Sequence, residues 1–167
     1  WNKPLTDRVD VFLQQTGLTY KEMLSLLSCD FINPIVDQGT GERKIVIRAD
    51  LDKTESENTC ELDKLMLDGM QRGHLKEIHR FVRLWRKLEL SMYDLDKAAS
   101  SFCVTLVGVT VLKRICQTLY LKDSLHLPLE LILSLYSDIG IVDYVDFTKD
   151  GYPELPSLYK KLFLNKT

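Results

Sequence analysis

The segment from His79 to Lys97 restricts the possible folds more than any other part of the sequence. Its first half places apolar residues at three- and four-residue spacing, the pattern of a helix with one buried face. These residues are Leu75, Ile78, Phe81, Val82, Trp85 and Leu88. The pattern then restarts at Ser91, which is followed three residues later by Asp94, a short form of the capping box that begins a helix. The segment therefore predicts a helix from His74 to Leu88 with Trp85 buried, a tight turn, and a second helix from Ser91 to about Ser100.

Cap and stop signals predict further short helices on both sides of this hairpin. Thr6 or Asp7 begins a helix that runs from Leu5 to Gln15 and ends at Gly17. A full capping box at Thr19–Glu22 begins the next helix. Later helices are predicted at Thr105–Leu121, from Pro128 to about Ser137, and from Pro156 to Asn165. The expected fold is mainly α, a bundle of about seven short helices or a stack of helical hairpins.

The helix from Thr105 to Leu121 is expected to bury one apolar face. That face consists of Leu106, Val109, Leu112, Ile115, Cys116 and Leu119. Cys116 is thereby interpreted as a small core side chain.

Residues 35–62 interrupt the helical pattern. Gly39 and Gly41 mark a turn, and Lys44–Arg48 is the best candidate strand in the chain. A second short strand is expected at Ile32–Val36 or at Thr59–Leu62, and the sequence does not decide between the two. We therefore expect a small β-hairpin or loop insertion at 35–62 within a single helical domain that spans 1–167. The first residues carry no basic or apolar leader, so we interpret the chain as a fragment of a much larger protein.

Three helix starts align without gaps, which suggests an internal repeat. The aligned segments begin at Leu18, Leu90 and Leu127, so they are 72 and 37 residues apart. These spacings are close to two units and one unit of a repeat of ~36 residues, a length typical of stacked helical pairs. The alternative is that the three leucine-rich helix starts align by coincidence and do not form a repeat.

Composition and charge exclude several classes of function. The 167 residues carry a formal net charge of -2, which gives no reason to expect nucleic acid or an anionic membrane as a partner. The longest apolar run, Val104–Leu112, is too short to span a bilayer. Four widely separated cysteines argue against zinc and are expected to be free thiols: Cys29, Cys60, Cys103 and Cys116.

Two charged segments have both a functional and an ordinary interpretation. Asp146–Gly151 resembles the start of a calcium-binding loop, but Pro153 and Ser157 stand at its eighth and twelfth positions, so a polar turn is the better prediction. A basic stripe is formed by Arg80, Arg83, Arg86 and Lys87. It would suit phosphates or an acidic partner, but we favour a solvated helix face with Glu77, Asp94 and Asp96 near enough in sequence to pair with it.

No group of residues has the spacing of a catalytic, cofactor or metal site. His74 and His79 are five apart and so lie on different faces of a helix, and His126 is distant in sequence. No serine stands in a nucleophile-elbow motif. The chain is therefore interpreted as a non-enzyme without a cofactor, and no site residues are assigned.

Several motifs, in order along the chain, resemble the A component of bacterial toxin complexes, the insecticidal Tc toxins. The family's "RFIRLWRKLGW" and "ELDKAL" helices are similar to His79–Leu88 and Tyr93–Lys97, although Glu89 stands where the family has glycine. The other similar segments are Thr19–Leu27 with Phe31–Pro34, Cys60–Leu67, Leu127–Tyr136 ("LPxxELLxLW") and Ser157–Asn165 ("SLYxxLFLN").

The resemblance implies a piece of the α-helical shell around the channel of a large, secreted, pore-forming and pentameric virulence protein. That protein binds target cells and translocates a toxic enzyme. Neighbouring domains or subunits of the same toxin are the implied partners, with a host-cell receptor possible and no membrane span in this segment. The alternative is a protein-binding or receptor-binding helical module without a translocation role. A shell fragment is expected to expose an apolar surface of several hundred Å², around the first or last helix.

Overall fold

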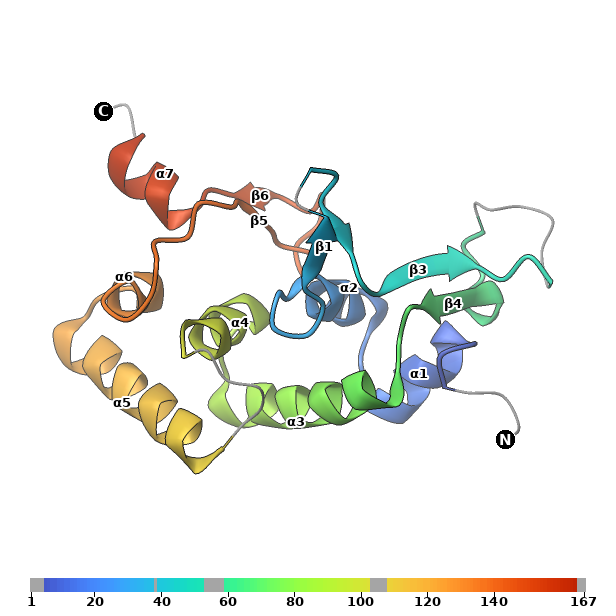
Figure 1. Cartoon of the computed structure of the whole chain (residues 1–167), viewed down its shortest axis with the longest axis horizontal. Helices are drawn as coiled ribbons and strands as arrows, with labels where there is room; N and C mark the ends of the chain where they lie inside the picture. Colours follow the sequence, from blue (N-terminus) through green and yellow to red (C-terminus); the bar gives the residue numbers. More distant parts are fainter. Residues whose placement is uncertain (1–4, 38, 53–58, 103–107, 165–167) are drawn as a thin grey trace. The chain divides into compact units, whose positions relative to one another are not determined.

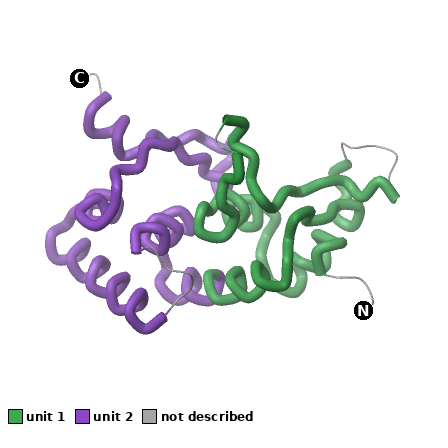
Figure 2. The backbone as a smooth tube through the Cα atoms, viewed as in Figure 1, with its two compact units in different colours: residues 1–81 green, residues 82–167 purple. Residues whose placement is uncertain are grey.

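The structure, a computed structural model, describes residues 5–37, 39–52, 59–102 and 108–164 (Figure 1). It confirms the mainly α fold, with 51% helix, seven helices and three two-stranded antiparallel sheets in the described residues. The chain divides into two compact units, Trp1–Phe81 and Val82–Thr167, which are described separately below (Figure 2).

The first helix of unit 1, α1 (Val9–Thr16), begins four residues later than predicted. Neither Thr6 nor Asp7 caps it, and Arg8 occupies the N-cap position without a side-chain hydrogen bond to the helix. The carbonyl of Thr6 instead accepts a hydrogen bond of 2.7 Å from the N–H of Leu67, which fixes this residue outside the helix. The predicted stop is confirmed, because Gly17 ends α1 in the left-handed conformation with φ 64°.

The second helix, α2 (Tyr20–Ser28), has the capping box that the sequence predicts. The N–H of Glu22 donates to the hydroxyl of Thr19 over 3.2 Å, and the N–H of Thr19 donates to the Glu22 carboxylate over 2.7 Å. Two N–H groups that the first helical turn leaves unpaired are thereby satisfied.

Unit 1 contains two small sheets where one hairpin was expected. Strands β1 (Ile35–Asp37) and β2 (Glu42–Arg43) pair with each other, and β3 (Val46–Ala49) pairs with β4 (Leu65–Asp68). The first place predicted for a second strand, Ile32–Val36, overlaps β1 and is confirmed in part. The second, Thr59–Leu62, contains no strand, and Leu62 begins a short 3-10 helix, η1 (Leu62–Lys64). Neither place is the partner of β3. The true partner, β4, buries Leu65 and Leu67 and leaves Met66 and Asp68 partly exposed, which is the alternation of a half-buried strand.

Asn33 connects α2 to the segment that leads into β3, and its side chain is fully buried. Its amide nitrogen donates to the carbonyls of Leu27 (2.9 Å) and Ile45 (2.8 Å). Its amide oxygen accepts from the N–H of Ile45 at 2.7 Å. Because Ile45 is held in this way, the strand begins at Val46, two residues after its predicted start at Lys44.

The central helix, α3 (Arg72–Leu88), is followed by α4 (Met92–Ser101), as the sequence predicts. Ser91 caps α4 by accepting a hydrogen bond of 3.0 Å from the N–H of Asp94. Ile78, Phe81 and Val82 are buried on α3. Trp85 is only partly buried, and Arg86 lies 6.0 Å from the centre of its ring. The expectation of a fully buried Trp85 is therefore wrong.

Glu89 occupies the turn between these helices with φ 54°, a conformation that disfavours residues with a Cβ atom. We expect Glu89→Gly to raise the free energy of unfolding by about 1 kcal/mol, measured by urea denaturation, because glycine adopts this conformation without strain. Glu89→Ala is the matched control, since it removes the carboxylate but retains the strain. An equal gain in Glu89→Ala would show that charge, and not backbone conformation, limits stability here.

In unit 2, α4 packs against α5 (Val109–Leu125) and α6 (Leu129–Leu133), and α5 packs against α6. The predicted start of α5 at Thr105 lies outside the described residues, and the helix continues four residues beyond its predicted end. α6 ends four residues before its predicted end, because the N–H groups of Leu135 and Tyr136 bond to carbonyls three residues back in a turn.

The chain between α6 and α7 contains a third sheet. Strand β5 (Tyr144–Val145) pairs with β6 (Glu154–Leu155). The last helix, α7 (Leu158–Phe163), follows the sheet, with Ser157 at its N-cap.

The buried face of α5 agrees with the prediction only in part: Ile115 is buried, Leu112 and Leu119 are partly buried, and Leu106 lies outside the described residues. Val111, Ile115 and Thr118 are buried, whereas Val109 and Cys116 are exposed, so the interpretation of Cys116 as a core side chain is wrong. The hydroxyl of Thr118 donates to the Arg114 carbonyl over 2.8 Å, which allows a polar residue on the buried face. Among the described residues, Cys29, Cys60 and Cys116 form no disulfide bond, and Cys103 lies outside these residues.

The three aligned helix starts are confirmed as helix starts. α2, α4 and α6 each begin at the third residue of the aligned segments. Met23, Leu95 and Ile132 occupy equivalent positions in the alignment, and each is at most 1% exposed. Their arrangement as stacked repeats stays a prediction.

Candidate functional site

The acidic segment Asp146–Gly151 lies in the connection between β5 and β6. An Asp146 carboxylate oxygen accepts a hydrogen bond from the N–H of Thr148 over 3.0 Å, and Lys149 lies 3.4 Å from the other oxygen. Bonding by Thr148 is the main reason that the pKa of Asp146 lies below its usual value. Both oxygens of the Asp146 carboxylate therefore interact with residues of the same polar turn. In the part of the chain that the structure describes, no three His, Cys, Asp or Glu side chains are placed to hold a metal ion.

The three histidines occupy ordinary structural positions. His79 is exposed on α3, and His126 ends α5 in the left-handed conformation. His74 accepts a hydrogen bond of 2.9 Å at Nδ1 from the N–H of Gln71, just before α3. Partial burial, together with the charge of Lys44, lowers the pKa of His74 below its ordinary value of 6.5.

The lowered pKa of His74 predicts a loss of stability in weak acid. Below about pH 6.5 the unfolded chain binds a proton at His74 that the folded chain resists, so stability falls as the pH falls below this value. We expect the urea midpoint to decrease from pH 7.5 to pH 5.5, and by less in His74→Gln. His79→Gln should retain the wild-type pH dependence. Equal pH dependence in the wild type and His74→Gln would contradict the assignment.

The basic stripe on α3 is exposed to solvent, which supports the interpretation of a solvated helix face. Arg80, Arg83, Arg86 and Lys87 are all exposed. Glu77 lies near Arg80: burial raises the pKa of this carboxyl, and the charge of Arg80 partly offsets the effect. The Asp94 carboxylate accepts one hydrogen bond, from the hydroxyl of Ser91. The stripe therefore offers charge but no enclosed site.

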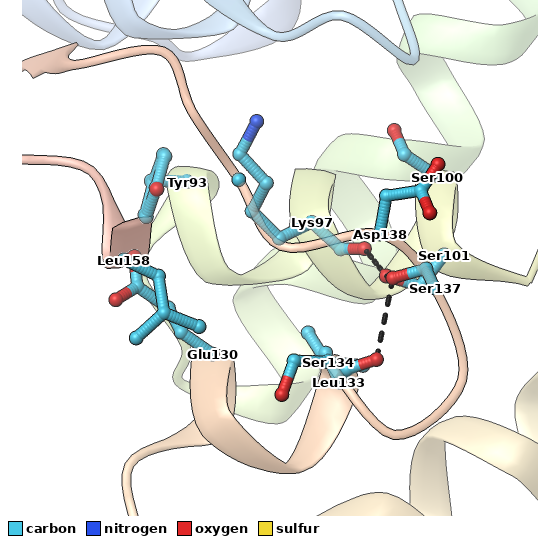
Figure 3. Close-up of a pocket in the computed structure, with 11 residues that line it drawn as sticks. Tyr93, Lys97, Ser100, Ser101, Glu130, Leu133, Ser134, Ser137, Asp138 and Leu158 are labelled. Carbon is cyan, nitrogen blue, oxygen red and sulfur yellow. Dashed lines mark hydrogen bonds between the residues drawn. The ribbon is translucent and has the colours of Figure 1, made fainter. Parts of the chain in front are cut away.

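A hollow of about 310 Å³ lies in unit 2, bounded by α4, α6 and the start of α7 (Figure 3). Serine hydroxyls on its wall donate to backbone carbonyls of their own helices: Ser101 to Lys97 (2.7 Å) and Ser134 to Leu131 (2.7 Å). Ser137 lies within hydrogen-bond distance of the Ser101 hydroxyl and the Leu133 carbonyl. These hydroxyls are thus bonded to each other or to the backbone rather than to a base, so they do not have the arrangement of an activated nucleophile.

The other wall of this hollow is held by Tyr93 and Glu130. The ring of Tyr93 stacks on Tyr144 with 4.2 Å between ring centres, and the Lys97 ammonium lies 5.3 Å from its centre. Burial, and then the hydrogen bond to Glu130, raises the pKa of the Tyr93 hydroxyl. Glu130 also forms an ion pair of 2.9 Å with Lys161 of α7. These contacts attach α7 to α4 and α6, and we assign the hollow a structural role.

The most unusual surface of the described residues surrounds α7, where only Leu158 is buried. Lys160 forms an ion pair with Asp143, and Lys161 pairs with Glu130, so both lysines bind the helix to its own unit. The apolar residues of the helix are left exposed, with Phe163 at 62%.

The loop that precedes β5 lies beside α7 and extends this exposed surface. The carbonyl of Gly140 accepts from the N–H of Tyr159 over 3.1 Å, and Asp143 accepts from the N–H of Ser157 over 3.0 Å. Ile141, between these contacts, is 71% exposed. The α7 surface is defined here as Ile141, Val142, Tyr159, Leu162, Phe163 and Leu164, all exposed.

Exposed apolar residues are expected around the first or last helix, and the α7 surface lies at the last. α1, by contrast, buries Val9 and Phe12 completely. The ion pairs of Lys160 and Lys161 are not predicted by the sequence pattern, since their partners are 17 and 31 residues away in the sequence.

No protein-family model, curated protein or solved structure matches the chain. None of the helices in the described residues combines the length and the apolar composition that crossing a membrane would need.

Proposed function

We propose that the chain is a structural module of the α-helical shell in the A component of a secreted bacterial toxin complex. In this role it contributes packing surface to the wall around a translocation channel and performs no chemistry itself. Its partners are neighbouring domains or subunits of the same toxin, which acts on host cells.

The observation that carries this proposal is the ordered series of motifs that resemble the toxin family. Each of four motifs falls on or around a helix: His79–Leu88 on α3, Tyr93–Lys97 on α4, Leu127–Tyr136 around α6, and Ser157–Asn165 around α7. The related segment Phe31–Pro34 contains Asn33, whose buried side chain connects two elements of unit 1. The segments that resemble the toxin family thus include Asn33, a residue that connects two elements of the fold.

The α7 surface also favours a packing role. Exposed aromatic and aliphatic side chains that gather on one face of a protein are typical of surfaces that another protein covers. Sequencing the coding DNA on both sides of this chain tests the proposal. We expect a reading frame of several thousand residues beside genes for other toxin components, and a short frame that encodes an isolated domain would contradict the shell role.

The second candidate is a helical module that binds a receptor on the host cell, favoured by the exposed basic stripe of α3. It predicts saturable binding of the labelled chain to cultured insect cells, reduced when Arg83 and Arg86 are replaced by glutamine. A shell module predicts no saturable binding by the isolated chain.

A further inference from the structure

We propose that a small pocket in unit 2 binds the carboxylate group of an organic anion, with Arg114 as the residue that pairs with it. The pocket has a volume of about 250 Å³ and shares only Ser101 with the larger hollow described above. It is lined by the end of α4, the middle of α5 and the turn after α6: Ser101, Phe102, Arg114, Gln117, Thr118 and Tyr136. The inference concerns unit 2 alone and does not depend on the toxin assignment.

The charge of the pocket favours an anion. Arg114 is the one charged residue of the lining, and it forms no ion pair with any residue that the structure describes. The adjoining segment 103–107, which lies outside the described residues, contains no acidic side chain. The chain therefore supplies no carboxylate at this place, and a guanidinium group forms its strongest hydrogen bonds with one.

An aromatic contact positions the guanidinium without using its hydrogen-bond donors. The guanidinium carbon of Arg114 lies 5.9 Å from the centre of the Phe102 ring, within the range of a cation–π interaction. The buried Phe102 ring in turn packs edge-on against Tyr136, with 5.7 Å between the ring centres. Because Arg114 is restricted by this contact, it loses less conformational entropy on binding than a freely moving arginine would.

Two neutral donors lie in the same pocket. Gln117 is three residues after Arg114 on α5, so the two side chains lie on the same face of the helix. Neither the Gln117 amide nor the Tyr136 hydroxyl bonds to another side chain or to the backbone in the described part of the chain. The Thr118 hydroxyl, by contrast, donates to a carbonyl of its own helix. The two oxygens of a carboxylate can accept several bonds from such donors.

The charge and size of the pocket restrict the ligand to a small monocarboxylate. One guanidinium balances one negative charge, whereas a phosphate monoester carries nearly two at neutral pH. The volume lies just below the ~300–1,000 Å³ of pockets for drug-sized ligands, so the ligand is smaller than these. The rings of Phe102 and Tyr136 offer an apolar wall, which suits a carboxylate attached to an apolar body. Both a free aromatic acid and the C-terminus of a polypeptide have this chemistry.

An NMR titration of the ¹⁵N-labelled full chain with benzoate, at constant ionic strength, tests the proposal. We expect saturable shifts of the N–H signals of Arg114 and Gln117, with a Kd on the order of 1 mM. Benzamide has the same size but no charge and should bind about tenfold more weakly or worse. N-acetylphenylalanine represents the C-terminus of a polypeptide, so tighter binding of this compound than of benzoate would identify a polypeptide as the source of the carboxylate.

Variants on α5 test the role of Arg114. Arg114→Gln should lower the affinity for benzoate about tenfold or more, and Arg114→Lys, which keeps the charge but loses the planar fork, should lower it by less. Lys113→Gln is the matched control, because Lys113 is exposed on the same helix but does not line the pocket, and its affinity should equal that of the wild type.

The comparison of benzoate with benzamide uses the wild-type chain and so does not depend on how the variants fold. Absence of saturable shifts at about ten times the expected Kd would overturn the proposal. Equal binding of benzamide would overturn it, because the contact would then be apolar only. Equal loss of affinity in Lys113→Gln would show that general positive charge, and not this pocket, attracts the anion. Tighter binding of inorganic phosphate than of benzoate would also overturn the assignment of a carboxylate.

Discussion

Replacing Gly69 with alanine is expected to lower the free energy of unfolding by about 3 kcal/mol or more. Gly69 lies between β4 and α3 with φ 78°, a conformation that strains any residue with a side chain. An added Cβ atom would also lie 2.1 Å from the carbonyl oxygen of Lys44. That oxygen belongs to the backbone, so no side-chain rotation can relieve the clash.

Urea denaturation measures this effect, with Gly73→Ala as the matched control. Gly73 lies in the first turn of α3, and a Cβ atom added there would meet nothing within 4 Å. Gly73→Ala should therefore be neutral or stabilising by up to ~1 kcal/mol, since alanine favours a helix more than glycine does. A loss of less than ~1 kcal/mol in Gly69→Ala would contradict the close approach of these two backbone segments.

Truncating Asn33 to alanine is expected to destabilise the fold by ~3–5 kcal/mol. The change removes three hydrogen bonds in a fully buried position. It leaves the carbonyls of Leu27 and Ile45 and the N–H of Ile45 without those bonds, and each buried unpaired group costs about 1–3 kcal/mol. A total stability of about 5–15 kcal/mol makes this a large fraction of the whole.

Denaturation monitored by circular dichroism, with Gln71→Ala as the control, tests the role of Asn33. Gln71 is an exposed amide in the same unit, and its truncation should change the stability by no more than ~0.5 kcal/mol. If Asn33→Ala also changed stability by only that amount, Asn33 would not connect α2 to β3 as described.

Local helix signals were the most predictable part of this fold. The capping box of Thr19 and Glu22, the serine cap of Ser91 and the glycine stop at Gly17 all act between residues a few positions apart. All the residues that form each of these interactions therefore lie within a short segment of the sequence. Gly69 separates β4 from α3, whereas Gly73 is accommodated inside α3.

Contacts between distant residues explain what the sequence did not predict. The start of α1 is fixed by Leu67, and the start of β3 depends on Asn33. The strand β4, which pairs with β3, was not predicted because it is only four residues long, a window in which alternation is a weak signal. The phase of α5 was wrong because its buried face is selected by packing on α4 and α6, which accept the hydrogen-bonded Thr118.

The sequence predicted the position of the α7 surface in the chain but not the ion pairs that hold α7. Leucine and aromatic residues at Leu158–Phe163 indicated an apolar helix at this position. Its orientation depends on ion pairs with Asp143 and Glu130, which join segments that sequence periodicity does not connect. The spacing of residues within a short helix does not indicate which of its lysines will pair with carboxylates far away in the sequence.

Electron microscopy of the protein encoded by the whole reading frame tests the proposed shell role most directly. An epitope inserted after Thr40, in the exposed turn between β1 and β2, would mark this chain with a bound antibody fragment. The shell role predicts one antibody fragment per subunit, arranged as a ring on the outer wall of a closed oligomer with a central channel. Fragments on a monomer, or on flexible arms away from any channel wall, would contradict it.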